Sequence, residues 1–145
     1  MFQWLWGEWF DTNRFGQLEE LLTEEFKRNY EEAGSYVGMI RGKHGEEGQY
    51  WIGMFLPAHT IVPEGYEFID IPASKLGVCW IHGLEEEVLC KEEQCGEKLV
   101  QNNMNPIIGS DGAWWRFERY NCSRYTQKDE NGKIILDLCH FLNAI

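Results

Sequence analysis

The sequence predicts an α+β fold, with a mostly antiparallel sheet that carries helices on one face. Three observations predict it. Strand-like segments outnumber those with helical spacing, an Asn-Gly turn precedes the last strand-like segment, and the elements follow the order helix-β-β, then β-helix-β-β. That order indicates two β-α-β-β-like units on one sheet, the first without its opening strand.

Helical spacing dominates the first thirty residues. The apolar residues of the first helix lie on one helix face and are Phe2, Leu5, Trp6, Trp9 and Phe10. Residues 11–13 are polar, interrupt the pattern and offer helix caps. The spacing resumes over residues 18–30, and Gly34 ends that segment.

The middle of the chain is predicted to be extended. Strand-like segments are expected at residues 35–41, 50–56, 66–71 and 75–82, with a hairpin loop at 42–49 and a loop at the prolines between 57 and 65. A further helix is expected at residues 84–99. Its apolar face holds Val88, Cys95 and Leu99, whereas its glutamates, Glu92 among them, are expected to face solvent.

The last third is predicted to be a hairpin. Residues 113–120 and 133–142 are strand-like, and Asn131-Gly132 is a strong turn signal between them. The whole chain is expected to form about six or seven strands.

Composition limits the function classes. The 145 residues fit one domain, and the net charge of −11 argues against binding to nucleic acid or to an anionic membrane surface, because both need a basic face. No apolar stretch could span a bilayer, and the first residues lack the basic region of a signal peptide. Aromatic residues make up 14% of the chain, so some rings are expected to line a pocket or an interface.

The cysteines predict a reducing compartment. There are five, an odd number, and no CxxC pair occurs. We expect reduced, partly buried thiols in a cytoplasmic protein, with no metal site. No phosphate-binding or dinucleotide-binding motif occurs either, so no cofactor is expected.

Five motifs, in the same order, resemble those of the GyrI-like effector-binding domains. They are residues 49–55 (QYWIGMF), 62–67 (VPEGYE), 71–73 with 78–83 (IPA, VCWIHG), 117–120 (FERY) and 132–140 (GKIILDLCH), and Trp6 with Trp9-Phe10 resembles LWxxF. The family supplies the ligand-binding module of AraC- and MerR-type bacterial transcription regulators and of small stand-alone proteins. The chain, over residues 1–145, is identified as a stand-alone member.

The resemblance implies a curved, mostly antiparallel sheet with two main helices on one face. It also implies a cleft that takes bulky, planar, often cationic compounds, with a buried carboxylate among aromatic side chains. Some stand-alone members hydrolyse cyclopropane-bearing, DNA-alkylating natural products, and some antagonise gyrase-directed toxins. The family's usual first strand is not evident, because Met1 stands almost at the first helix. Either a strand is missing, a partner such as a second copy completes the sheet edge, or this subgroup differs.

Glu118 is the first candidate site residue. Strand alternation puts Trp114, Arg116, Glu118 and Tyr120 on one face. A carboxylate beside aromatic rings suits a flat organic cation, since each ring adds about 0.5–2 kcal/mol of cation–π attraction. The alternative is an ion pair with Arg116, two residues away.

Asp137 is the second candidate. It interrupts an apolar strand, so its carboxylate must face water, a partner or a cavity, and an outward position on the strand is the alternative. If Glu118 and Asp137 share the cleft, repulsion would raise the pKa of one of them. They would then be the catalytic pair of a hydrolase, one donating a proton while the other stays charged.

Aromatic residues complete the predicted ligand site. The strongest candidates are Trp80 and Trp114, followed by Tyr120, Tyr36, Tyr50 and Trp51, although alternation sends about half of such rings into the core. The predicted function is binding of a hydrophobic, planar, cationic small molecule, for sensing or sequestering a drug or toxin. The alternatives are hydrolysis of an electrophilic toxin in the same cleft, and a protein-interaction module that acts on a separate regulator or on gyrase.

Overall fold

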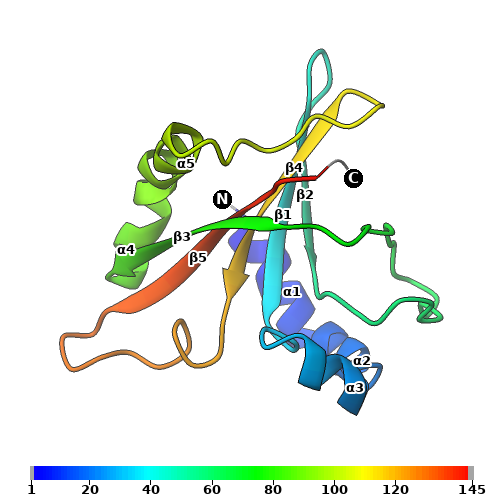
Figure 1. Cartoon of the computed structure of the whole chain (residues 1–145). Coiled ribbons are helices and arrows are strands. Elements are labelled where there is room, and N and C mark those ends of the chain that lie inside the picture. The colour runs from blue at the N-terminus through cyan, green and yellow to red at the C-terminus, as the bar shows by residue number, and fades with distance from the viewer. Residues whose placement is uncertain (1, 144–145) are drawn as a thin grey trace.

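The computed structural model describes residues 2–143. Its strands are β1 (Tyr36–Lys43), β2 (Gln49–Gly53), β3 (Leu76–Gly83), β4 (Ala113–Tyr120) and β5 (Ile134–Phe141). They form one sheet in the order β2-β1-β4-β5-β3, with every neighbouring pair antiparallel. Figure 1 shows a strongly twisted sheet in which β3 and β5 run across the direction of β1 and β2. The predicted α+β class is confirmed, with five strands in the described part of the chain instead of the larger number expected.

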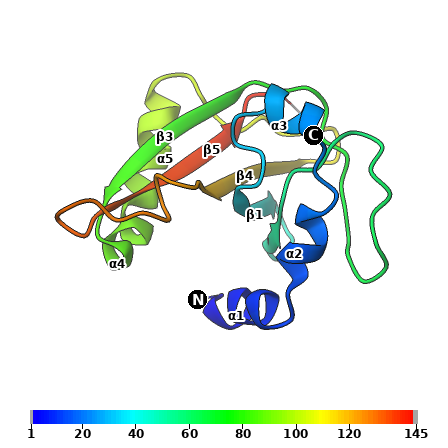
Figure 2. The ribbon, with the colours of Figure 1, turned by 90° about the horizontal axis from the view of Figure 1, so that it is seen from below.

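Short helices make up the rest of the regular structure. They are α1 (Gln3–Asp11), α2 (Arg14–Glu19), α3 (Glu24–Asn29), α4 (Glu85–Val88), the 3₁₀ turn η1 (Leu89–Lys91) and α5 (Glu92–Gln101). Figure 2 shows α1 at a distance from α4 and α5. The segment predicted as one helix over residues 18–30 is broken, because Thr23 Oγ1 accepts the Phe26 N–H and begins α3 there.

A long loop, residues 54–75, connects β2 to β3. It contains the segment 66–71, which was predicted to be extended but forms no strand. Side-chain contacts hold the segment instead. Tyr66 Oη donates to the Arg14 carbonyl oxygen, 2.8 Å away, and Ile69 and Ile71 pack against the sheet.

The sheet has two differently covered faces. On the one we call the helix face, α4 and α5 cover a core of Ile81, Val88, Cys95, Leu99, Ile134, Leu136 and Leu138. On the opposite face, called the loop face, the 54–75 loop covers a core of Val37, Met39, Trp115, Phe117, Cys139 and Phe141. Burial of both faces explains why β5 is apolar along nearly its whole length.

The expectation of five reduced thiols is wrong for two of them. Cys79 of β3 and Cys95 of α5 form a disulfide, with their Cα atoms 6.0 Å apart. The two cysteines are 16 positions apart in the sequence. They meet because both side chains pack in the core of the helix face. Cys90 and Cys122 are exposed free thiols, and burial raises the pKa of the Cys139 thiol to about 12.

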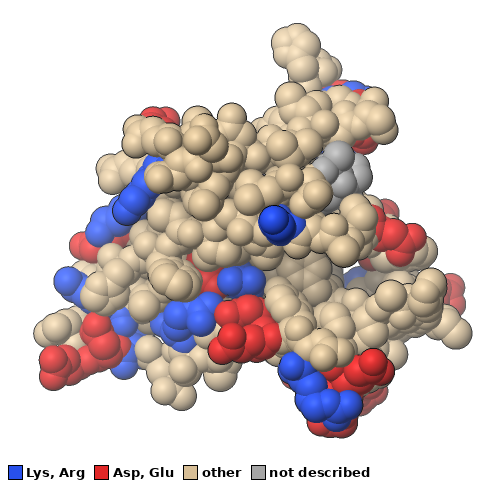
Figure 3. Space-filling model, viewed as in Figure 1, with Lys and Arg blue, Asp and Glu red and all other residues tan. Residues whose placement is uncertain are grey.

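Charges are mixed on the surface seen in Figure 3, where acidic and basic side chains gather together on the lower half and the upper half carries few. Among residues 2–143, no helix combines the length and apolarity needed to cross a membrane.

Candidate functional site

A groove of about 850 Å³ opens on the helix face. Its walls come from α5 and the 105–108 segment, and its floor comes from β4 and β5. Its polar and aromatic lining includes Glu92, Trp114, Arg116 and His140, and the exposed apolar residues Leu89, Val100 and Ile108 lie at the rim. A volume of this size suits a small organic molecule.

The floor on β4 confirms the alternation that was predicted for Trp114, Arg116, Glu118 and Tyr120. These residues stand opposite Gly42, Ile40, Gly38 and Tyr36 of β1, so all four share the helix face. Trp114 lies across Gly42, where any Cβ would collide with the indole ring. The Arg116 guanidinium stands 6.0 Å from the centre of the Trp114 ring.

Two carboxyl groups meet beside this floor. Glu118 is only 5% exposed and accepts a hydrogen bond from Tyr120 Oη. Glu92 approaches it from α5 and lines the groove. The predicted alternative, a Glu118–Arg116 salt bridge, is not among the contacts of the described residues.

Burial favours the protonated form of both acids. Desolvation, reinforced by the charge of Glu118, raises the pKa of Glu92 to about 8, with an opposing effect from the Arg116 charge. Burial also raises the pKa of Glu118, although the hydrogen bond from Tyr120, the neighbouring Glu92 and the Arg116 charge favour its charged form. With a pKa of about 8, Glu92 holds a proton at neutral pH.

Glu92 is a site residue that the sequence interpretation assigned to solvent. A signal for it is nevertheless present in the helical spacing. Glu92 lies four residues after Val88, three before Cys95 and seven before Leu99, which puts it on their buried face. An acidic residue on an otherwise buried helix stripe was the observation that could have identified it.

An aromatic cluster adjoins the acid pair on the side of α1. Trp6 Nε1 donates to Tyr50 Oη at 3.1 Å, and the Trp6 ring packs edge-on against Tyr120 with 5.0 Å between ring centres. Phe2 stacks on Tyr50 at 4.3 Å. Burial, followed by the charge of Glu118, raises the pKa of Tyr50 and of Tyr120, so both phenols stay protonated and available as donors.

Gly38 permits this cluster, because the Tyr50 phenol lies where its Cβ would be. We expect Gly38→Ala to displace Tyr50, break its bond with Trp6 and lower the free energy of unfolding by about 1–3 kcal/mol. Urea unfolding would measure the loss. Gly53→Ala in the neighbouring strand is the matched control, since a Cβ there has open space. Equal effects of the two substitutions would contradict this role for Gly38.

His140 is a further groove residue to which the sequence interpretation gave no role. Its side chain is almost completely buried, at 2% exposure, and its Nδ1–H donates to the Met104 carbonyl oxygen at 2.9 Å. Burial and the Arg116 charge lower the pKa of His140, against the opposing effect of the Met104 bond. The imidazole is therefore neutral, with Nε2 as an acceptor.

Asp137 does not share a cleft with Glu118. Asp137 pairs with Arg119 across the strands, whereas Glu118 faces Leu138, so the two acids lie on opposite faces of the sheet. Asp137 is 0% exposed and accepts from Arg119 Nε at 2.8 Å and from Arg124 Nη2 at 2.6 Å. The predicted catalytic pair of Glu118 and Asp137 is therefore wrong, and the partners of the buried Asp137 carboxylate are two arginines.

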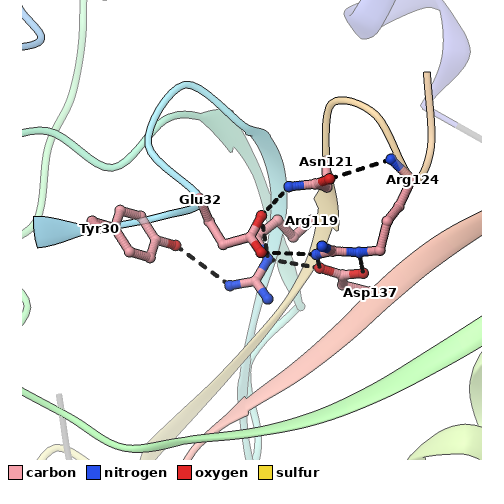
Figure 4. Close-up of polar contacts among 6 residues, drawn as sticks. All are labelled: Tyr30, Glu32, Arg119, Asn121, Arg124 and Asp137. Carbon is pink, nitrogen blue, oxygen red and sulfur yellow. Dashed lines mark hydrogen bonds and ion pairs between the residues drawn. The ribbon is translucent and has the colours of Figure 1, made fainter. Parts of the chain in front are cut away.

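Figure 4 shows the network around Asp137, with the Arg119 and Arg124 side chains directed at it. Glu32 joins from the segment before β1, where Arg124 Nη2 donates to its carboxylate at 2.9 Å and Asn121 also donates. Two acids thus balance two arginines. The network ties together three segments that are distant in sequence, which is a structural function.

Three other predicted ligand residues lie outside the groove. Trp80 and Trp51 are on the loop face, where Trp80 is 65% exposed beneath Arg124 and Trp51 packs against Trp115. Tyr36 is on the helix face, but it stacks on Phe15 of α2 and donates to Glu19. Of the seven predicted ligand residues, Trp114 lines the groove, and Glu118, Tyr120 and Tyr50 adjoin it.

A second cavity, of about 1010 Å³, lies on the loop face beneath the 54–75 loop and includes Trp51 in its lining. Its lining is mainly apolar and lacks a pair of buried acids. Among residues 2–143, no group of three or more His, Cys, Asp or Glu side chains is placed to hold a metal ion.

No family model, curated protein or solved structure matches this chain.

Proposed function

We propose that the chain binds planar, hydrophobic, cationic small molecules in the groove on the helix face, as a sensor or sequestering protein. The observation that carries the proposal is a pair of neighbouring carboxyl groups beside aromatic side chains: half-buried Glu92, which lines a groove with an apolar rim, and buried Glu118, which adjoins that groove. The proposed binding function agrees with the resemblance of the sequence motifs to those of GyrI-like domains. Membership of that family is itself part of the proposal.

The charge balance of the site favours a cation. When Glu118 is ionised, the adjacent Arg116 offsets its charge, and Glu92 carries a proton at neutral pH. A cationic ligand beside Glu92 takes over the role of that proton, which is released as the ligand binds. Trp114 supplies a ring for stacking, and ring contact with a cation adds about 0.5–2 kcal/mol.

The test compares a charged ligand with an uncharged one in wild type and in Glu118→Gln. The ligands are 5-methylphenanthridinium and neutral phenanthridine at pH 8, with quenching of tryptophan fluorescence as the readout. Loss of a desolvated charge partner costs a few kcal/mol, and about 1.4 kcal/mol is a factor of ten. We therefore expect Glu118→Gln to weaken the cation at least ten-fold and phenanthridine by less than about three-fold.

Glu93→Gln is the matched control, because Glu93 is an exposed acid at the edge of the same groove. We expect it to change neither affinity by more than about two-fold, since exposed charges interact weakly. Equal weakening of both ligands by Glu118→Gln would mean that Glu118 supports the fold only. If neither ligand binds to the wild-type protein, the binding function is wrong.

Hydrolysis of an electrophilic, cyclopropane-bearing compound is the second candidate function, and the same acid pair favours it. Glu92, whose pKa is raised to about 8, is a protonated acid at neutral pH, as general acid catalysis requires, and Glu118 places a second carboxyl group beside it. The fate of the ligand separates the two functions, since a binding protein returns the compound unchanged and a hydrolase does not.

The compartment is also a proposal. The free thiols of Cys90, Cys122 and Cys139 agree with the reducing cytoplasm, whereas the Cys79–Cys95 disulfide is more typical of an oxidising compartment. Mass spectrometry of protein that is alkylated before lysis would show which state Cys79 and Cys95 have in the cell.

A further inference from the structure

The cavity beneath the 54–75 loop has the dimensions of a ligand site. Its volume is about 1010 Å³. Protein interiors are close-packed and hold few voids larger than a water molecule, whereas pockets for small organic ligands measure about 300–1,000 Å³. Figure 1 shows the loop arching away from the strands on the right of the view, and Figure 3 shows the surface hollowed at that place. The cavity is therefore too large to be a packing defect.

The apolar lining of this cavity is accessible. Trp51, Met54, Phe55, Leu56 and Ile71 all line it, and each of them is only half-buried. They come from the end of β2 and from the loop itself. A ligand in the cavity contacts these side chains directly and removes their exposed apolar surface from water, which is favourable.

Gly53 shows that the open space reaches the sheet. It stands opposite Val37 in the β1–β2 register, and Val37 belongs to the core of the loop face, so a Cβ at Gly53 would point toward the cavity. Apart from the chain neighbours of Gly53, no atom of the described residues lies within 4 Å of that Cβ position. The floor of the cavity is thus unfilled at a strand position that could carry a side chain.

The loop can admit a ligand because its backbone is not bonded to the sheet. In the described part of the chain, residues 54–74 form two backbone hydrogen bonds, Thr60 N–H to the Pro57 carbonyl and Tyr66 N–H to the Pro63 carbonyl, and both close local turns. Such a loop opens without breaking the sheet ladder. Loops longer than about 12–15 residues without secondary structure are commonly functional in compact domains.

The charge of the lining selects the ligand. Among the described residues that line the cavity, none is a lysine or an arginine, and the two acids, Glu67 and Asp70, are exposed. An anion would find no cationic partner and would be repelled by both acids. A cation would find no buried carboxylate, and burial of an unpaired charge is costly. An uncharged molecule avoids both penalties.

We propose that the cavity beneath the 54–75 loop is a second binding site, which takes an uncharged, lipophilic small molecule such as a long-chain alcohol. The site does not depend on the proposed function of the groove, because it lies on the other face of the sheet and its lining disfavours cations. The two faces of the sheet then serve two different ligand chemistries.

The experiment uses N-phenyl-1-naphthylamine, an uncharged dye whose fluorescence rises in apolar surroundings, with 1-decanol and decanoate as competitors at pH 8. The two competitors have the same chain length and differ in charge. We expect 1-decanol to displace the dye from the wild-type protein at a concentration at least ten-fold lower than decanoate. Equal displacement by the two compounds would overturn the assignment to an uncharged ligand.

Gly53→Phe tests the position of the site. Its ring occupies open space beneath the loop, so we expect the dye and 1-decanol to bind at least about five-fold more weakly. Gly7→Phe is the matched control, because a Cβ at Gly7 also has open space but Gly7 lies on α1 and outside the cavity lining. We expect the control to change neither affinity by more than about two-fold. Dye binding that resists Gly53→Phe would place the ligand elsewhere and overturn the proposal.

5-Methylphenanthridinium separates this inference from the proposed function. Gly53→Phe should leave its affinity within about two-fold of wild type, and Glu118→Gln should do the same for the dye. If the dye depends on Glu118 and not on Gly53, it binds in the groove and only the second site is wrong. If the dye does not bind to the wild-type protein, the inference fails, and sedimentation would show whether a second copy of the chain covers the cavity instead. The comparison of 1-decanol with decanoate decides the matter even if Gly53→Phe does not fold.

Discussion

Asp137→Asn is expected to lower the free energy of unfolding by about 3–5 kcal/mol, because it removes one partner from a buried charge pair. The aspartate is 0% exposed and is hydrogen-bonded by both Arg119 and Arg124. Its neutral replacement leaves two arginine charges to share Glu32 alone. Urea denaturation, with tryptophan fluorescence as the signal, measures the loss.

Asp111→Asn is the matched control for this prediction. Asp111 also forms an ion pair with an arginine, Arg41, at 3.4 Å, but its side chain is 53% exposed. Exposed pairs of this kind contribute about 0–1 kcal/mol. If Asp137→Asn proves no more destabilising than Asp111→Asn, the network around Asp137 is not the stabilising element that its burial indicates.

Asp137→Asn also tests the separation of the sheet into two faces. Because Asp137 lies on the loop face, Asp137→Asn should leave the affinity for 5-methylphenanthridinium within about two-fold of wild type under conditions where the variant is folded. A large loss of affinity in folded protein would place Asp137 back in the ligand site.

Local patterns predicted the strands well where alternation and burial agree. The bounds of β4, residues 113–120, match the prediction, and its alternation correctly grouped Trp114 with Glu118. The helical spacing over residues 18–30 was misleading, because a capping side chain inside it, Thr23, divides the segment. Alternation and helical spacing describe a segment but not the point at which a cap interrupts it.

Relations between strands could not be predicted in the same way. Alternation assigns residues to the faces of one strand, but the register decides which faces of two strands coincide. Here Asp137 stands opposite Arg119, and a shift by one position would have placed it beside Glu118. Thirteen residues separate β4 from β5, so no tight hairpin turn fixes that register.

Glu92 and His140 were missed because their importance depends on tertiary contacts. Glu92 has the spacing of a buried residue, yet a run of glutamates on the same segment makes a solvent-exposed face the simpler interpretation. His140 becomes a groove residue only through its pairing with Arg116 and its bond to the Met104 carbonyl, 36 residues away in the sequence.

Protonation of Glu92 predicts that the protein loses stability as the pH rises. Its pKa is about 8 in the folded protein against an ordinary value of 4.5, so between these values the folded state binds more protons than the unfolded state. The free energy of unfolding therefore falls with increasing pH over this range. The contribution of Glu92 is fully present below pH 4.5 and is lost as the pH rises through about 8.

Glu92→Gln should remove this dependence, because glutamine imitates the protonated acid at every pH. Glu92 retains some solvent contact, which screens its charge, so we expect the variant to be more stable than wild type by about 1–3 kcal/mol at pH 9 and equally stable at pH 5. Glu86→Gln, at an exposed position of α4, removes the same formal charge and should shift stability by less than about 0.5 kcal/mol at either pH. Urea unfolding at the two pH values, with the Cys79–Cys95 disulfide kept oxidised, gives the comparison.

Parallel pH profiles for wild type and Glu92→Gln would show that Glu92 is ionised in the folded protein at neutral pH. Binding of 5-methylphenanthridinium would then proceed without the release of a proton from Glu92.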